Sequence, residues 1–137
     1  MKNYFFALIT LFFITSCDID DSNLQYRLVH VPVNEVIILD EFYLGETYNI
    51  KFNYLRPSAC HFYDGTYVER DDNVMTLAIQ NYEIIGGGAC NQLQNEEVEV
   101  NFNFYVENPG SYIFKFWQGK DANGEDLFLI YEIPVID

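Results

Sequence analysis

Residues 97–106 read EVEVNFNFYV, an alternation of polar or amphipathic side chains with apolar ones. Successive side chains of a β-strand point to opposite faces of a sheet, so this period of two predicts a half-buried strand. The apolar face carries Val98, Val100, Phe102, Phe104 and Val106. The outer face carries Glu97, Glu99, Asn101, Asn103 and Tyr105. The stretch therefore predicts a sheet with one face in a core and the other in water.

The same alternation recurs along the chain, and no segment shows sustained helical periodicity. Short alternating runs separated by Gly, Pro, Asn and Asp indicate an antiparallel all-β domain. The predicted strands cover residues 26–31, 35–40, 48–54, 60–68, 74–84, 97–106, 111–118 and 126–135. About seven to eight strands at this spacing predict a sandwich of two packed sheets over residues 25–137.

In size and strand spacing this domain resembles an immunoglobulin-like or fibronectin-like sandwich, in architecture only. The turn at residues 108–112, NPGSY, is similar to a corner of many such sandwiches. The order Cys, Trp, Cys that marks antibody domains is absent, because the only tryptophan, Trp117, follows both Cys60 and Cys90.

The last two predicted strands can be aligned on each other through Asn123-Gly124. This pair favours a two-residue type I′ turn, which needs a positive φ at both positions. With that turn, Lys115 faces Glu132 and Trp117 faces Ile130. The face predicted to lie in the core then consists of Tyr112, Phe114, Phe116, Leu129, Tyr131 and Ile133.

The opposite face of this hairpin is unusually apolar for a solvated sheet. We interpret it as a candidate binding face for a protein partner or for the rings of a glycan. Two other interpretations stay open, namely that a neighbouring strand or loop covers it, or that the two faces are inverted. The candidate face consists of Ile113, Lys115, Trp117, Phe128 and Ile130, with Glu132 beside them.

The N-terminus has the pattern of an export signal. Lys2 is followed by an apolar run over residues 4–14, interrupted only by Thr10. The run fits the hydrophobic region of a signal peptide and is shorter than the roughly 20 residues that span a bilayer. It ends in Ile14-Thr15-Ser16-Cys17, which resembles the lipobox of bacterial lipoproteins. The resemblance implies cleavage after residue 16 and diacylglycerol and acyl (palmitate-type) chains on Cys17, which would anchor the chain in a membrane.

An acidic segment, DIDDSN, follows at residues 18–23. Short acidic stretches are usually solvated tethers, which predicts a tether over residues 17–24. The segment also resembles the export tag of Bacteroidota lipoproteins, which implies an outer-membrane location with the domain on the cell surface.

The charge of the chain excludes one class of partner. Removing residues 1–16 takes away Lys2 and no acidic residue, so six cationic and 21 acidic residues leave a net charge of −15. Nucleic acids and anionic lipids need a basic footprint. The sequence therefore predicts no nucleic-acid partner.

With Cys17 acylated, Cys60 and Cys90 remain as a pair. Two cysteines in an exported domain indicate a disulfide. The alternative is a metal site that uses the adjacent His61, but it lacks a fourth ligand and Cys-x-x-Cys spacing.

No pattern selects a catalytic site or a cofactor. His30 and His61 lie on separate runs, and no serine has the context of a nucleophile elbow. Residues 86–88, GGG, lack the Lys and Ser/Thr of a phosphate loop. The acidic segments 69–73 and 121–126 do not match the spacing of a calcium-binding loop. The sequence predicts neither an enzyme, nor a cofactor, nor a metal site.

These observations favour a lipid-anchored, non-catalytic binding or accessory domain at the outer membrane. Two hypotheses from other classes stay open. The domain could inhibit a hydrolase through its loops, as small immunoglobulin-like inhibitors do, or it could be a structural spacer in the envelope.

Overall fold

A computed structural model describes residues 24–136 of the chain. The predicted signal segment, Cys17 and the tether up to residue 23 lie outside the described residues. Nine strands form within residues 24–136: β1 (Gln25–Val31), β2 (Glu35–Ile37), β3 (Phe42–Tyr43), β4 (Thr47–Leu55), β5 (His61–Asp71), β6 (Val74–Ile85), β7 (Glu97–Tyr105), β8 (Ser111–Lys120) and β9 (Asp126–Ile136).

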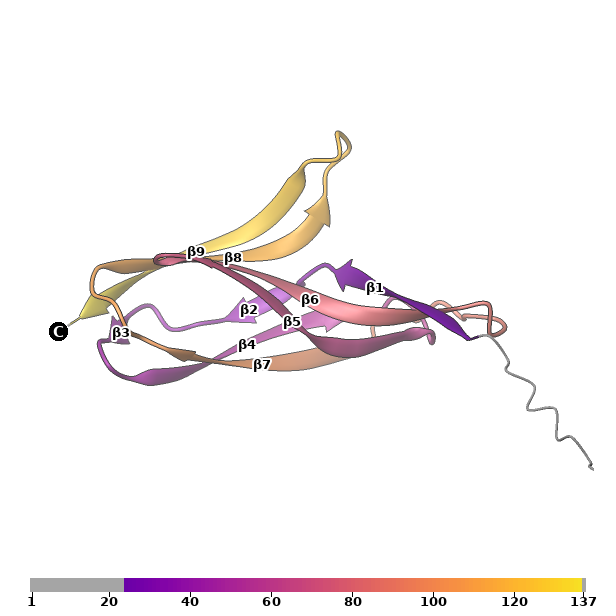
Figure 1. Cartoon of the computed structure of the whole chain (residues 1–137), viewed down its shortest axis with the longest axis horizontal. Helices are drawn as coiled ribbons and strands as arrows, with labels where there is room; N and C mark the ends of the chain where they lie inside the picture. Colours follow the sequence, from indigo (N-terminus) through magenta and orange to yellow (C-terminus); the bar gives the residue numbers. More distant parts are fainter. Residues whose placement is uncertain (1–23, 137) are drawn as a thin grey trace, which may run out of the picture.

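The strands form two layers, which confirms the all-β sandwich (Figure 1). A three-stranded sheet has the order β2-β4-β7, and a six-stranded sheet contains the other strands. The tip of the β8–β9 hairpin rises away from the three-stranded layer (Figure 1). The eight predicted strands are all present, and β3 is an additional one. Two pairs, β6 with β8 and β3 with β9, are parallel in an otherwise antiparallel arrangement.

Strand β6 organises the larger sheet. Strand β5 pairs with it along one edge, from Val74 to Glu83. The opposite edge is shared, because β8 runs parallel to residues 74–77 and β1 runs antiparallel to residues 79–85. Where the two meet, the Val33 N–H donates to the Trp117 carbonyl at 2.9 Å. The end of β1 and the middle of β8 are therefore neighbours.

The core fills the space between the two sheets with aromatic side chains. Phe52 of β4 packs on Phe116 of β8 with 5.2 Å between ring centroids, and Phe104 of β7 packs on Phe114 at 5.1 Å. The apolar positions of residues 97–106 face inward, and their polar partners are exposed, as the alternation predicts. The buried core residues include Ile50, Tyr54, Leu77, Ile79, Val100, Tyr112 and Ile133.

The predicted register of the last hairpin is wrong by two residues. Lys115 faces Ile130 instead of Glu132, and Trp117 faces Phe128 instead of Ile130. Asn123 does not adopt the positive φ that a type I′ turn requires, and only Gly124 does.

A longer loop replaces the predicted two-residue turn. The Asp121 N–H donates to the Glu125 carbonyl, and the Asp121 carboxylate accepts the N–H groups of Asn123 and Glu125. A bulge containing Gly119 (φ 101°) then shifts the register between Trp117 and Lys120. A shift of two residues in the register keeps every side chain on the same face of the sheet, so the predicted division into core face and outer face is confirmed.

Cys60 and Cys90 form the predicted disulfide, with 5.4 Å between their Cα atoms. It joins the start of β5 to the connection between β6 and β7. The Arg56 guanidinium supports the same region, because it pairs with Glu96 at 2.9 Å and lies 4.9 Å from the centroid of the Phe62 ring. Since both thiols are bonded to each other, the alternative of a metal site on Cys60, Cys90 and His61 is ruled out.

Candidate functional site

The structure places the candidate binding face on the outer side of the six-stranded sheet. Ile130 is 62% exposed, whereas Ile113, Lys115, Trp117 and Phe128 are half-buried. The Lys115 ammonium lies 4.5 Å from the centroid of the Phe128 ring, a cation–π contact across the hairpin. The predicted residues therefore share one solvent-accessible surface.

Neighbouring strands extend this surface further than the sequence indicates. On β1, Tyr26 is 73% exposed and Leu28 is 61% exposed. Tyr67 of β5 and Tyr82 of β6 lie on the same face, because Tyr82 pairs with Leu28 and Ala78 pairs with Tyr67. The outward positions of β1 and β6 alternate with inward ones, but the sequence does not reveal that these strands lie beside β8.

A cleft of about 340 Å³ crosses this outer face at the junction of β1 and β8. We call it the Trp117 cleft. The cleft is deep at its base because β6 contributes only the small side chains of Thr76 and Ala78 there. Register places Tyr67 beside Ala78 and Glu69 beside Thr76. The complete lining is His30, Tyr67, Glu69, Thr76, Ala78, Trp117, Lys120, Asp126 and Phe128.

Aromatic contacts connect the walls of the Trp117 cleft. The His30 ring lies 5.4 Å from the Tyr67 ring and 5.9 Å from the Trp117 ring, measured between centroids. The imidazole meets the indole edge to face, at 68° between the planes. Edge-to-face pairs are a favoured aromatic geometry. His30 therefore bridges the two walls.

Asp126 fixes the orientation of the indole. Its carboxylate accepts the Trp117 Nε1–H at 2.9 Å and the Lys120 ammonium at 2.7 Å. The hydrogen bond from Lys120 and then that from Trp117 lower the pKa of Asp126 below its ordinary value. The carboxylate is therefore charged at neutral pH, and it engages the only cation that lines the cleft.

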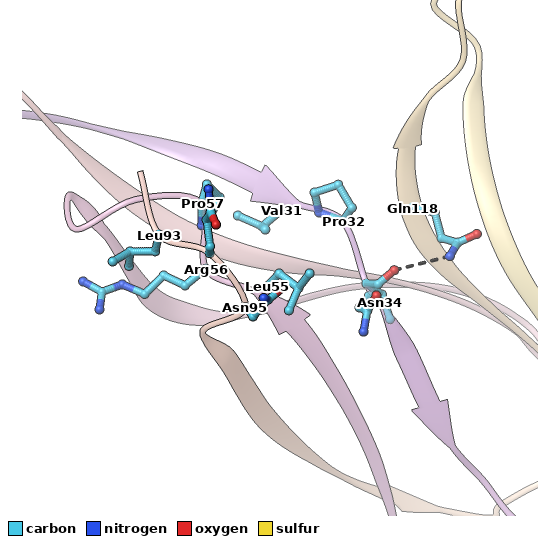
Figure 2. Close-up of a pocket in the computed structure, with 11 residues that line it drawn as sticks. Val31, Pro32, Asn34, Leu55, Arg56, Pro57, Leu93, Asn95 and Gln118 are labelled. Atoms are coloured by element: carbon cyan, nitrogen blue, oxygen red, sulfur yellow. Dashed lines mark hydrogen bonds between the residues drawn. The ribbon is translucent and has the colours of Figure 1, made fainter. Parts of the chain in front are cut away.

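A second hollow of about 560 Å³ lies between the end of β1, the end of β4 and the connection before β7 (Figure 2). Its lining is mostly aliphatic or amide, including Pro32, Leu55, Leu93 and Gln118. Figure 2 shows the guanidinium of Arg56 pointing away from Pro32 and Gln118. That guanidinium donates to the Ala59 carbonyl and pairs with Glu96. This hollow therefore offers no uncommitted charged group.

The structure also reveals a serine–histidine contact that sequence reasoning missed. Ser58 Oγ lies 2.8 Å from His61 Nδ1 and accepts the Cys60 N–H at 3.2 Å. Ser58 is buried, and both contacts lie within one turn. The pair therefore stabilises the turn before β5 and presents no accessible nucleophile.

No group of three or more His, Cys, Asp or Glu side chains within residues 24–136 is placed to hold a metal ion. In the 121–126 segment, the Asp121 carboxylate accepts two N–H groups of its own loop. The same part of the chain contains no helix that could cross a membrane.

Comparison of the chain with protein-family models, with curated protein sequences and with solved structures found no match. The functional argument therefore depends on the residues and geometry of this chain alone.

Proposed function

We propose that this chain is a lipid-anchored lipoprotein of the outer membrane whose sandwich domain is a non-catalytic binding module on the cell surface. The lipobox-like sequence before Cys17 and the acidic segment 18–23 support the proposed location at the outer membrane. The outer aromatic face around the Trp117 cleft supports the binding role, and it is the observation that carries the proposal.

An exposed aromatic face needs an explanation, because the sandwich already buries its core between the two sheets. Apolar side chains on the outer side of the larger sheet contribute little to that core, and each costs free energy when it contacts water. Contiguous apolar patches on soluble domains mark sites of contact with partners. Trp and Tyr are enriched among the residues that dominate binding energy. A contact surface for a protein or a glycan accounts for this face.

Trp117→Ala is the direct test of the binding role. Because the indole forms part of the proposed contact surface, we expect the variant to lose most of the wild-type binding to an array of oligosaccharides and a panel of purified proteins. Its melting temperature should fall by no more than about 4–8 °C, equivalent to about 1 kcal/mol in a domain of this size.

Ile37→Ala is the matched control for Trp117→Ala, since Ile37 is 62% exposed on the other sheet. The control should bind like the wild-type protein. Equal binding by wild type and Trp117→Ala, or a much larger loss of thermal stability, would contradict the proposed role of this face.

Cys17→Ala tests the anchor. A chain without this thiol has no site for the diacylglycerol group, and several acyl chains at about 0.8 kcal/mol per buried methylene are what hold a lipoprotein in a bilayer. We expect the variant to lose metabolic labelling with palmitate and to move from the outer-membrane fraction to the soluble fraction. Cys17→Ala that still labels and sediments with the membrane would refute the anchor, and protease treatment of intact cells separates surface from periplasmic exposure.

A further inference from the structure

We propose that the Trp117 cleft binds the side chain of an arginine on a basic partner protein. This inference depends on the proposed binding function and specifies its ligand. Three features support it: the aromatic walls of the cleft, its carboxylates and the charge of the whole chain.

The walls of the cleft offer an aromatic face to a flat group. Strands β5 and β8 are the two neighbours of β6, so their backbones lie about 10 Å apart, twice the spacing between adjacent strands. Tyr67 lies on one side and Trp117 on the other, and the His30 ring occupies the space between these two rings. A planar guanidinium stacks on a single aromatic face, so it can lie on the Trp117 wall beside His30, above the small side chain of Thr76.

The carboxylates favour a cation over a neutral ring. Asp126 is engaged by Lys120 and Trp117, but Glu69 has no ion-pair partner among residues 24–136 and accepts only a 3.5 Å contact from the Tyr67 hydroxyl. A guanidinium stacked in the cleft would bring its N–H groups toward the Glu69 carboxylate, and arginine pairs with carboxylates through two parallel hydrogen bonds. Glu69 thereby gains the partner that the chain itself does not supply.

The overall charge points to the same kind of ligand. The chain carries a formal net charge of −14, which repels anions and attracts a basic partner. Such complementarity accelerates encounter and weakens as salt rises. A neutral sugar would stack on the same rings, but it would use neither the charge of Glu69 nor the field of the protein.

The experiment uses the mature acylated protein, which begins at Cys17, in detergent micelles and the fluorescence of Trp117, the only tryptophan of the chain. The probes are acetyl-Gly-Arg-Gly-amide and its citrulline analogue, which keeps the planar shape without the charge, titrated into the millimolar range. We expect the arginine peptide to change the fluorescence saturably, and the citrulline peptide to bind at least about tenfold more weakly, equivalent to about 1.4 kcal/mol. Added sodium chloride should weaken the arginine peptide alone.

Glu69→Gln should weaken the arginine peptide by a similar factor while leaving the citrulline peptide unchanged. Glu97→Gln is its matched control, because Glu97 is exposed on the three-stranded sheet and does not line the cleft. The control should stay within about twofold of wild type, a difference of roughly 0.4 kcal/mol.

The possible failures of this test are distinguishable. Equal binding of the two peptides, or a Glu69→Gln variant that binds arginine like wild type, overturns the arginine site. A neutral oligosaccharide such as maltohexaose that changes Trp117 fluorescence where the arginine peptide does not also overturns it, yet leaves the proposed binding function in place. If no peptide, oligosaccharide or protein of the panel binds in a way that depends on Trp117, both proposals fail.

Discussion

Phe114→Ala is expected to destabilise the domain by about 3–5 kcal/mol, the range measured when a buried phenylalanine is truncated. Phe114 is fully buried at the centre of the sandwich, where its ring contacts those of Phe42 and Phe104 at 5.9 and 5.1 Å between centroids. Truncation removes these contacts and leaves a cavity that the surrounding strands cannot fill. Because single domains are stable by only about 5–15 kcal/mol, this one change consumes a large share of the total.

Urea unfolding followed by circular dichroism measures the effect, with the slope of the transition as a check on two-state behaviour. Ile130→Ala is the control, because Ile130 lies on the adjacent strand but points outward. Its cost should be within about 0.5 kcal/mol, as for most surface substitutions. A loss below about 1 kcal/mol for Phe114→Ala would show that this position is not in the core.

Replacing both disulfide cysteines, Cys60→Ser with Cys90→Ser, is the second change with a large expected effect. The bridge spans 30 residues of sequence, so its loss should cost about 2–5 kcal/mol, mainly by freeing the unfolded chain. The connection at residues 86–96 is held by this bridge and by backbone hydrogen bonds from Ala59 to Asn91 and from Leu93 to Pro57.

The double variant should unfold at a lower urea concentration than wild type, and a reductant should shift wild type to the same midpoint. The reductant should leave the urea midpoint of the double variant unchanged. Because reduced wild type lacks the bridge but keeps its cysteines, equal midpoints for the two proteins would show that the serine substitutions themselves do not destabilise the domain. A wild-type midpoint that does not respond to complete reduction would mean that the bridge contributes nothing to stability.

Alternation of residue type predicted the two faces of β7 and of the β8–β9 hairpin, but apart from that hairpin it did not predict which strands are neighbours. Phe114 and Phe116 could be assigned to the core because side chains alternate between the two faces of a strand. An error of an even number of residues in the pairing of β8 with β9 leaves each side chain on the same face. The register itself depends on the turn, and the hydrogen bonds of the Asp121 carboxylate changed a two-residue turn into a longer loop. Strand β3 was missed because two residues carry no period.

The candidate site was predictable only in part, for a similar reason. Trp117 and Phe128 lie on one hairpin, so local pattern was enough to place them on one face. Tyr67 and His30 come from strands far away in sequence, and only the pairing of β5 and β1 with β6 brings them to the same cleft. No local signal encodes that pairing. Tyr67, which forms the other wall, and His30, which contacts both walls, were therefore identified only from the structure.

The shared edge of β6 has a kinetic consequence. Strand β1 comes from the beginning of the described chain and β8 from near its end, yet both must dock on the same strand before the larger sheet is complete. Joining remote segments requires closing long loops before their contacts contribute, so folding on the millisecond-to-second scale of non-local β-domains is expected. A nascent chain that ends before β8 lacks one of the two neighbours of the first half of β6, together with the core side chains Phe114 and Phe116. We therefore expect the larger sheet to form only after the last hairpin has been made.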